Sequence, residues 1–443
     1  MSFTDLGLPE WLNESLSNMA ITKPSAIQKA CIPEIMKGKD CIGGARTGSG
    51  KTIAFAAPML AEWSKDPCGI FGLVLTPTRE LAIQIAEQFT ALGANMNIRV
   101  ALIYGGVDMV KQSLELQKMP HFVIATPGRL ADHIRSSGED TIRGFRRVKY
   151  VVMDEADRLL TPGFVPDLKT CMDLLPGPSK RQTLLFTATV TDAVRALKDR
   201  TGEKGPPFIH EIASDIAVPS TLTQSYLFLP GYVREAYLWA ILTHPDNEKK
   251  SAIIFVNRTQ TAETLRRMLM SLDVKTASLH SEMRQQERVN ALGRFRAQAA
   301  RVLVATDVAS RGLDIPTVEM VINFDLPADA DDYIHRVGRT ARAGRKGQSI
   351  SLVTERDVDR VTNIEERVGS KMEKYELIED DKVVEEYLTP ASTAKRQAIL
   401  DMEADNFGER KRIQRKKAGL DVDMKSRNKK PKRAAKGKAD KKK

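Results

Sequence analysis

Two short stretches of this sequence combine residue types that could bind and hydrolyse a nucleoside triphosphate. The first is ARTGSGKT at residues 45–52, which follows an aliphatic run and leads into the helical pattern TIAFAAPMLAEW. It matches GxxxxGK[ST] except at the first glycine position, where Ala45 stands and Gly44 lies one residue earlier. Glycines let backbone N–H groups surround phosphates, Lys51 can pair with the terminal phosphates, and the Thr52 hydroxyl can bind Mg²⁺. The alternative, a glycine-rich turn without a ligand, is much rarer in this context.

The second stretch, YVVMDEADRLL at residues 150–160, places three acids directly after an apolar run. Three neighbouring carboxylates repel one another, so a cation must compensate for them. A strand that ends in Asp is the usual second half of a phosphate and Mg²⁺ site. We therefore expect Asp154 to hold Mg²⁺, Glu155 to deprotonate the attacking water, and Asp157 to link neighbouring loops. Without the ARTGSGKT stretch, the same acids would be interpreted as the solvated end of a strand.

A third stretch could supply positive charge to the reaction. HRVGRTARAGR at residues 335–345 carries Arg336, Arg339, Arg342 and Arg345 at intervals of three. Residues three apart on a helix share a face, so the spacing predicts a row of guanidinium groups. Such a row could provide arginine fingers, although an exposed basic helix is a common alternative.

The elements that must position these residues alternate between strand and helix. Aliphatic runs such as FGLVL, HFVIA and YVVMD are separated by helical patterns, and SAIIFV, VLVAT and VEMVINF repeat this order later. The alternation predicts an α/β fold with parallel sheets covered on both faces. VIATPGR and LVATDVASR share an order of residues that hints at duplication.

Composition divides the chain into five parts. A stretch rich in Pro, Gly and Ser near residues 205–222 separates two lobes, and charged helical sequence follows residue 375. We predict a first lobe, a linker, a second lobe, a charged helical extension and a basic tail. Their bounds are 1–208, 209–222, 223–375, 376–409 and 410–443.

Bulk composition excludes several classes of protein. The 443 residues are 42% hydrophobic and 28% charged, and no apolar run approaches the roughly 18 residues of a membrane span. The first residues lack the pattern of a secretory signal. Cys31, Cys41, Cys68 and Cys171 form no CxxC pair, and the six histidines show no metal-ligand spacing. We expect reduced thiols, no membrane partner, and a cytosolic or nuclear protein.

The net charge of +11 comes entirely from the tail. Residues 410–443 carry 17 Lys and Arg against three Asp, a net of +14, which leaves −3 for residues 1–409. The tail lacks the apolar residues needed to fold alone and is predicted to be disordered. We expect KKPKR at 429–433 to direct nuclear import and the tail to tether RNA electrostatically, with a merely solubilising tail as the alternative.

Together these stretches resemble the motifs of the DEAD-box RNA helicases. The resemblance runs from Phe3 to Arg345 and includes further motifs in the family's order. These are PTRELA (77–82), GG (105–106), TPGRL (126–130), TAT (187–189), IIFVN (253–257) and ATDVASRGLDI (305–315). The family implies two RecA-like lobes in tandem, an RNA-stimulated ATPase, ATP and Mg²⁺ as cofactors, and RNA as partner.

The resemblance also implies roles for individual residues. Gln28 would read the adenine edge, Phe3 would pack on the base and Asp314 would bind the ribose. Other nucleotide contacts would come from Ala45, Arg46, Thr47, Gly48, Ser49, Gly50, Lys51 and Thr52. The catalytic set would be Lys51, Asp154, Glu155, Arg339 and Arg342, with Thr52 and Asp154 on Mg²⁺. RNA phosphates would meet Pro77, Thr78, Arg79, Gly106, Thr126, Gly128, Arg129, Arg258, Gln285, Arg288 and Thr306. Asp157, Thr187, Thr189 and His335 would couple hydrolysis to RNA binding.

Three functions remain open at this point. The first is a helicase that separates short RNA duplexes by ATP-driven closure of its lobes. The second is an ATP-gated RNA clamp with little turnover, and the third, ranked last, is a DNA translocase. Stretches such as GGVDMVKQ and GRLADHIRSSG are similar to nucleolar members that mature small-subunit ribosomal RNA. This implies pre-rRNA, assembly proteins and a protein cofactor as partners in the nucleus and nucleolus; splicing, export and translation stay as alternatives.

Overall fold

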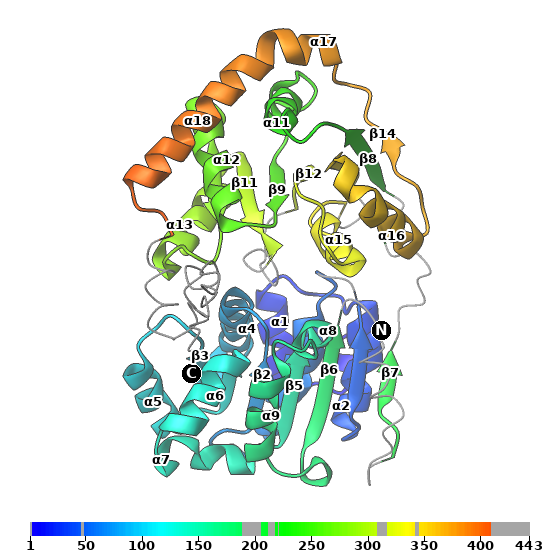
Figure 1. Cartoon of the computed structure of the whole chain (residues 1–443). Coiled ribbons are helices and arrows are strands. Elements are labelled where there is room, and N and C mark those ends of the chain that lie inside the picture. Colours follow the sequence, from blue (N-terminus) through cyan, green and yellow to red (C-terminus); the bar gives the residue numbers. More distant parts are fainter. Residues whose placement is uncertain are drawn as a thin grey trace, which may run out of the picture.

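The chain folds into two α/β lobes joined by a short connection. The computed structural model describes residues 2–45, 48–187, 205–210, 218–219, 221–307, 317–341 and 345–408. The first lobe lies at the bottom of Figure 1 and the second at the top. The predicted tandem of RecA-like parallel-sheet lobes is confirmed, whereas the predicted tail (410–443) lies outside the described residues.

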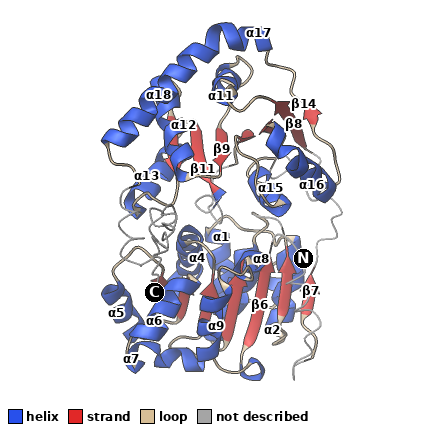
Figure 2. Ribbon diagram, viewed as in Figure 1, coloured by secondary structure: helices blue, strands red, loops and turns tan. Residues whose placement is uncertain are grey.

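The first lobe places its helices on both sides of one sheet (Figure 2). Its strands are β1 (Cys41–Gly44), β2 (Gly72–Leu75), β3 (Val100–Ile103), β4 (Phe122–Ala125), β5 (Tyr150–Asp154), β6 (Gln182–Thr187) and β7 (Phe208–His210). Its helices are α1 (Glu10–Asn18), α2 (Ala26–Met36), α3 (Lys51–Trp63), α4 (Arg79–Leu92), α5 (Met109–Gln117), α6 (Pro127–Ser136), α7 (Glu139–Ile142), α8 (Ala156–Leu159) and α9 (Val165–Leu174).

All strands of this sheet are parallel, in the order β3-β4-β2-β5-β6-β1-β7. Every residue of β2, β4 and β5 is buried, as expected for strands covered on both faces. Alternate residues belong to different cores, because Val74 and Val152 pack on one face of the sheet while Leu73 and Val151 pack on the other. The aliphatic runs of the sequence are therefore the strands of a two-sided core.

The second lobe repeats this arrangement. Its strands are β8 (Leu222–Phe228), β9 (Ala252–Val256), β10 (Thr276–Leu279), β11 (Val302–Thr306), β12 (Met320–Asn323), β13 (Gly347–Val353) and β14 (Glu373–Lys374). Its helices include α11 (Arg234–Thr243), α12 (Thr259–Ser271), α13 (Gln285–Arg296), α15 (Ala330–Val337) and α16 (Val358–Val368). The order β10-β11-β9-β12-β13-β8-β14 is the order of the first sheet, strand for strand along the chain. This shared topology agrees with the duplication that the sequence hinted at.

A charged extension follows the second sheet and packs on the helices α11 and α12 of the same lobe. It contains α17 (Asp380–Lys382), a π-helical turn (Val383–Tyr387) and the long helix α18 (Leu388–Ala404), drawn in orange in Figure 1. Ala398 and Met402 of α18 are buried in the described structure, and the Thr264 hydroxyl of α12 lies 3.3 Å from the Met402 sulfur. The extension is thus part of the second lobe rather than a separate unit.

The hydrophobic cores stay within single lobes. Among the described residues, two clusters contain side chains only from the first lobe and three contain side chains only from residue 218 onward. The first sheet includes β7, whose residues straddle the predicted lobe boundary at 208. Within the described residues, no helix has the length and apolar character that crossing a membrane requires.

Candidate ATPase site and nucleic-acid interface

The glycine-rich loop lies between β1 and α3, as the sequence predicted. Gly48 and Gly50 adopt φ angles of 79° and 87°, a left-handed backbone that glycine takes without strain. Ala45 N–H donates to the carbonyl of Thr187 at 3.0 Å, so the start of the loop is tied to the end of β6. Lys51 begins α3 directly after the loop. The loop and the N-terminus of α3 together form the usual geometry for holding phosphate.

Two polar groups of this loop have contacts that a phosphate could replace. The Lys51 ammonium is almost fully buried and donates to the Ala45 carbonyl at 2.9 Å. The Ser49 hydroxyl oxygen is buried and has no hydrogen-bond partner among the described residues. A buried ammonium on a neutral carbonyl and an unpaired hydroxyl both indicate that the loop is built for an anionic ligand.

The acidic stretch stands at the end of β5 with an unusual backbone. Glu155 has φ 53° and ψ 51°, a left-handed conformation that costs a non-glycine residue about 1–2 kcal/mol. The Asp154 carboxylate accepts the Glu155 N–H at 3.1 Å, which fixes the turn. Strain of this kind concentrates at functional sites, where it directs a side chain that an unstrained turn would point elsewhere.

Asp154 is buried beside other negative charges, an environment in which a bound cation would stabilise its carboxylate. The pKa of this carboxyl is raised to about 6, mainly by burial and also by the charges of Glu155 and Asp157, against the lowering effect of Lys51. The described residues contain no cluster of three or more His, Cys, Asp or Glu that could hold a metal alone. Asp154 and Thr52 nevertheless fit Mg²⁺ that is shared with a nucleotide, because this ion keeps most of its ligands as water and phosphate. When bound, Mg²⁺ would neutralise charge on the phosphates and on Asp154.

Gln28 already contacts the phosphate loop. Its side-chain oxygen accepts the Ser25 N–H at 2.9 Å, and its amide nitrogen donates to the Gly50 carbonyl at 3.0 Å. Only 3% of this residue is exposed, so adenine can be read only if one of these bonds is exchanged. Phe3 is likewise buried, within the core that contains Ile27. The base-contact roles of Gln28 and Phe3 therefore remain predictions, and Gln28 gains a second role as a link between α2 and the loop.

The two contacts of Gln28 suggest paired substitutions. Gln28→Glu keeps the acceptor for Ser25 but loses the donor to Gly50, whereas Gln28→Ala loses both. Because one such hydrogen bond contributes about 1 kcal/mol, we expect the KM for ATP to rise about fivefold in the first variant and further in the second. Both should lose preference for ATP over GTP. Steady-state turnover with each nucleotide measures this, and an unchanged preference in Gln28→Ala would contradict adenine reading.

The predicted helical row of arginines is wrong in one respect. Helix α15 ends at Val337, and Gly338 follows as its C-cap, so Arg339 stands beyond the helix and the residues do not share one helical face. Arg336 is 1% exposed and bonds both Asp307 oxygens at 2.6 Å, which makes it a structural residue of the second lobe. Arg339 is also buried, and its carbonyl accepts the Val318 N–H at 3.2 Å. A catalytic role for Arg339 remains a prediction.

A polar contact joins this region to the acidic stretch of the first lobe. The Nε2 atom of His335, in α15, lies 3.3 Å from an Asp157 carboxylate oxygen, and both side chains are largely buried. Asp157 thus makes the polar link expected of it, and its partner belongs to the other lobe. Thr187, also predicted to couple the sites, is fully buried at the end of β6 and bonds the phosphate loop through its carbonyl.

The predicted RNA contacts gather at helix N-termini of both lobes. Thr78 and Thr126 are the N-caps of α4 and α6, and Arg258 and Arg284 are the N-caps of α12 and α13. Helix N-termini carry free N–H groups and partial positive charge, which attract phosphate. The residues predicted to contact RNA at these sites are Pro77, Thr78, Arg79, Thr126, Gly128, Arg129, Arg258, Gln285 and Arg288. Thr306 stands at the end of β11.

Glycines 105 and 106 provide room for Arg79. A Cβ atom on Gly106 would lie 2.5 Å from Arg79 Nη1, and one on Gly105 would lie 3.1 Å from Nη2. Gly106 also has a φ angle of 90°. The guanidinium therefore rests against bare backbone, an arrangement that any side chain would disturb.

Gly106→Ala should weaken RNA binding without affecting ATP. The added methyl group would displace Arg79, and the left-handed φ would cost about 1–2 kcal/mol. We expect the RNA concentration for half-maximal ATPase stimulation to rise roughly tenfold, with the saturating rate and the KM for ATP preserved. Gly138→Ala is the matched control, since its φ is −68° and nothing lies within 4 Å of the new methyl group. Equal behaviour of the two variants would remove Arg79 and Gly106 from the interface.

Two of the arginines have partners that the sequence did not indicate. Arg288 Nη2 lies 2.8 Å from a Glu80 oxygen, and both side chains are buried, so the second lobe contacts the first lobe's PTRELA motif. Arg129 donates to the Val107 carbonyl at 2.7 Å and so supports the loop that follows Gly106. Glu80 was not among the predicted site residues. One indication of its role was present in the sequence: Glu80 is an acidic residue within a motif whose other residues suit phosphate binding.

Several predicted residues fall outside the described part of the chain. They are Arg46, Thr47, Thr189, Asp314 and Arg342. Their predicted roles stay as predictions from the sequence. The described residues nevertheless bring the phosphate loop, the acids after β5 and residues of α15 to one boundary between the lobes.

Family models match most of the folded chain. A model described as DEAD/DEAH box helicase matches residues 25–197, and one described as helicase conserved C-terminal domain matches residues 234–344. Between them the two models cover β1–β6 of the first sheet and β9–β12 of the second, and they end after α15. They leave the extension that contains α18 unmatched.

Curated relatives resemble the chain over its whole length. A protein of Yarrowia lipolytica (strain CLIB 122 / E 150) named ATP-dependent RNA helicase DBP8 is 97% identical over 442 residues, covering 100% of both chains. A protein of the same name from Candida albicans (strain SC5314 / ATCC MYA-2876) is 64% identical over 440 residues, covering 98% of this chain and 100% of its own.

Solved structures share the fold of the two lobes. S. cerevisiae Dbp5 bound to RNA and ADP BeF3 aligns with a TM-score of 0.73 at 29% identity, covering 89% of this chain and 99% of Dbp5. Mss116p (NTE and C-tail double deletion) bound to ssRNA and AMP-PNP aligns with a TM-score of 0.76 at 27% identity, covering 87% and 80%. Both alignments extend across the two lobes, which is the relation expected of proteins with one architecture.

Proposed function

This chain belongs to the DEAD/DEAH-box helicases and is an ATP-dependent RNA helicase, and from that premise we propose that it grips single-stranded RNA by its phosphates and separates short duplexes as ATP closes its lobes. Phosphate contacts carry no sequence information, so the two lobes should bind RNA with little sequence preference. Mg²⁺ would accompany ATP at Asp154 and Thr52. Substrate choice would then come from partners or from parts outside the shared motifs.

One observation carries this proposal. Within the described residues, two pairs of side chains join the lobes. Asp157, in the acidic motif of the nucleotide site, contacts His335. Glu80, in the PTRELA motif that is predicted to bind RNA, contacts Arg288. The relative placement of the lobes is therefore tied to both sites at once. The similar structures of Dbp5 bound to RNA and ADP BeF3 and of Mss116p bound to ssRNA and AMP-PNP support the same use of the boundary.

The competing proposal is an RNA clamp that closes with ATP but turns over little. The strained and buried Glu155 favours the enzyme, since a clamp gains nothing from a positioned base. Steady-state ATPase with and without RNA, combined with release of one strand from a short duplex, separates the two. Rapid RNA-stimulated turnover with strand release supports the helicase, whereas stable RNA retention without turnover would support the clamp.

For the cellular role, we propose maturation of small-subunit ribosomal RNA in the nucleolus, together with assembly proteins and a protein cofactor. The sequence stretches that resemble nucleolar members and the lysine-rich end support this role. Crosslinking the full chain to cellular RNA and sequencing the bound fragments would test it. Enrichment of pre-rRNA is expected; enrichment of spliced messenger RNA would point to export or translation instead.

The tail offers a separate test of localisation and RNA tethering. Residues 410–443 carry a net charge of +14, so each phosphate they neutralise releases counterions and makes binding sensitive to salt. The protein ending at residue 409 should leave the nucleus and need more RNA to reach the same ATPase rate, with a shallower salt dependence. Identical RNA titrations at every salt concentration would leave the tail with targeting or solubility alone.

A further inference from the structure

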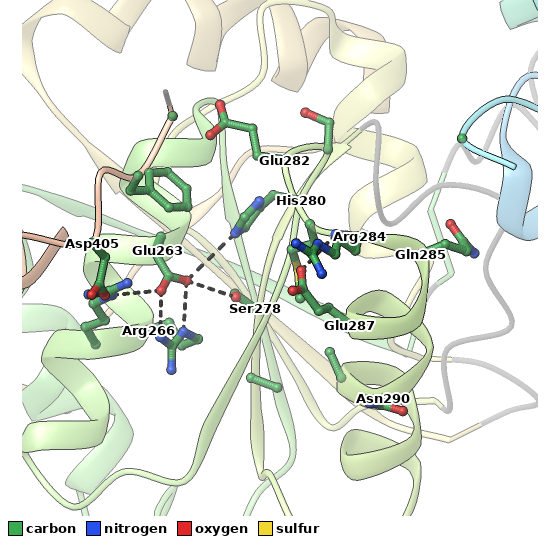
Figure 3. Close-up of a pocket in the computed structure, with 18 of the residues that line it drawn as sticks. Glu263, Arg266, Ser278, His280, Glu282, Arg284, Gln285, Glu287, Asn290 and Asp405 are labelled. Carbon is green, nitrogen blue, oxygen red and sulfur yellow. Dashed lines mark hydrogen bonds and ion pairs between the residues drawn. The ribbon is translucent and has the colours of Figure 1, made fainter. Parts of the chain in front are cut away.

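A large cavity extends from the predicted RNA contacts onto the outer part of the second lobe. Its volume is about 1060 Å³, and Arg79 and Gly106 of the first lobe line one end of it. The rest of the lining comes from α12, β10, the loop from β10 to α13, α13 itself and the residues that follow α18 (Figure 3). In Figure 3 Gln285 points toward the first lobe while Asp405 stands on the opposite side of the cavity. The cavity therefore connects the interface between the lobes with the C-terminal segment.

The segment Asp405–Gly408 forms the far wall and is held there by specific contacts. Arg267 Nη1 bonds the Asp405 carboxylate at 2.7 Å. The ring of Phe407 meets the ring of His280 edge to face, with centroids 5.7 Å apart. The Phe407 N–H donates to the Met402 carbonyl at 2.9 Å, so α18 fixes the direction of the segment. This wall lies beyond residue 344, where the matched family models end.

The charged side chains of the cavity differ in whether they form ion pairs. The acids of the far wall are neutralised by neighbours, since Glu263 accepts from Arg266 at 2.6 Å and from Arg267 at 2.8 Å, and Asp405 is bonded as well. Arg284 and Arg294, by contrast, are exposed and make no ion pair within the described residues. Glu282 and Glu287 also line the cavity, so five arginines face four acids and the net charge of the lining is slightly positive.

His280 is a buried polar side chain of this cavity. Only 2% of this residue is exposed, yet neither ring nitrogen has a hydrogen-bond partner among the described residues, and the nearer one is 3.8 Å from Glu263. The Gln285 amide at the other end of the cavity likewise lacks a partner within the described part of the chain. Unpaired donors, free guanidinium groups and an aromatic ring form the combination that single-stranded nucleic acid requires.

We propose that this cavity binds nucleotides of the RNA strand beyond those held at the helix N-termini, with Phe407 contacting a base and Arg284 and Arg294 contacting phosphates. The proposal rests on the proposed phosphate track along the helix N-termini, from which the cavity continues at Arg79 and Gly106. The chain's own tail is the less favoured occupant. Its net charge of +14 is of the same sign as the free arginines.

The test compares RNA oligonucleotides of increasing length. Full-length protein with a non-hydrolysable ATP analogue is titrated with oligouridylates of about 6, 8, 10 and 12 nucleotides, a range set by known single-strand site sizes. Wild-type affinity should rise when the RNA becomes long enough to enter the cavity. Phe407→Ala should bind the shortest RNA normally and lose about five- to tenfold of the gain with the longer ones, the effect of one lost base contact.

Two further variants keep the result interpretable. Leu400→Ala removes an apolar side chain that is 52% exposed on α18 and does not line the cavity, so it should match wild type at every length. Arg294→Gln leaves the anchors of the segment intact. It should lower the salt dependence of long-RNA binding by about 0.7 in log–log slope for one lost phosphate contact, without changing short-RNA binding.

The length series also separates this proposal from the one it rests on. If Gly106→Ala fails to weaken the shortest RNA, the phosphate track itself is wrong. If Phe407→Ala weakens all lengths equally, Phe407 only supports the lobe and the cavity proposal is overturned. A photo-crosslinker at residue 407 that captures residues 410–443 instead of long RNA would show that the tail occupies the cavity, which also overturns it.

Discussion

Glu155→Gln is expected to lower RNA-stimulated ATP hydrolysis by about 10²- to 10⁴-fold while ATP and RNA continue to bind. The amide has the same shape as the carboxylate but cannot accept a proton from the attacking water. Because the left-handed backbone at Glu155 is set by the turn after β5, the substituted side chain should stay in place. Single-turnover hydrolysis and equilibrium binding of a fluorescent ATP analogue, with and without RNA, measure the two quantities separately.

The contrast for Glu155→Gln is Lys51→Ala, which should lose ATP affinity itself. Lys51 meets phosphate in the ground state, whereas Glu155 acts on the water in the transition state. Glu62→Gln in α3 is the matched isosteric control, because Glu62 forms a surface ion pair with Lys65 and its loss should not affect turnover. Near-normal hydrolysis by Glu155→Gln would remove this residue from the role of base.

Arg342→Ala is expected to reduce the ATPase rate by about 10³- to 10⁵-fold with ATP affinity largely kept, since an arginine finger acts mainly in the transition state. This prediction comes from the sequence, because Arg342 lies outside the described residues. The structure excludes Arg336 as the arginine finger, because its guanidinium bonds Asp307 inside the second lobe. Single-turnover rates at saturating ATP and RNA provide the measurement.

Arg345 offers a matched control for the finger. It belongs to the same HRVGRTARAGR stretch, three residues further on, and is exposed. Arg345→Ala should therefore leave the rate within a small factor of wild type. A parallel fall in nucleotide affinity and rate for Arg342→Ala would indicate ordinary ground-state binding instead of a finger.

Local patterns were sufficient for the features that local physics decides. The apolar run before Asp154 predicted β5, and the alternation of strands and helices predicted a parallel sheet in each lobe. Threonines of PTRELA and TPGRL cap α4 and α6: the Thr78 oxygen accepts the Leu81 N–H at the start of α4, and Pro127 is the first residue of α6, a position that suits proline. These signals act within a few residues, so a sequence carries them directly.

Other features depend on contacts between distant parts of the chain and could not be predicted in this way. The pairing of Glu80 with Arg288, the anchoring of Asp405 by Arg267 and the bond from Gln28 to Gly50 all arise only after folding. The error in the arginine row had a different cause. A spacing of three is compatible with a helix but does not show where the helix ends, and Gly338 was the signal that stopped it.

The separation of the hydrophobic cores has a consequence for energetics. In the described residues no apolar cluster crosses from one lobe to the other, and the contacts that do cross include the Asp157–His335 and Glu80–Arg288 pairs. Exchanging polar pairs for water changes the free energy far less than exposing an apolar core does. The open and closed arrangements can therefore lie close in free energy. A ligand that prefers one of them by about 5.5 kcal/mol converts a 1:99 population into 99:1, which is within reach of a nucleotide and an RNA strand acting together.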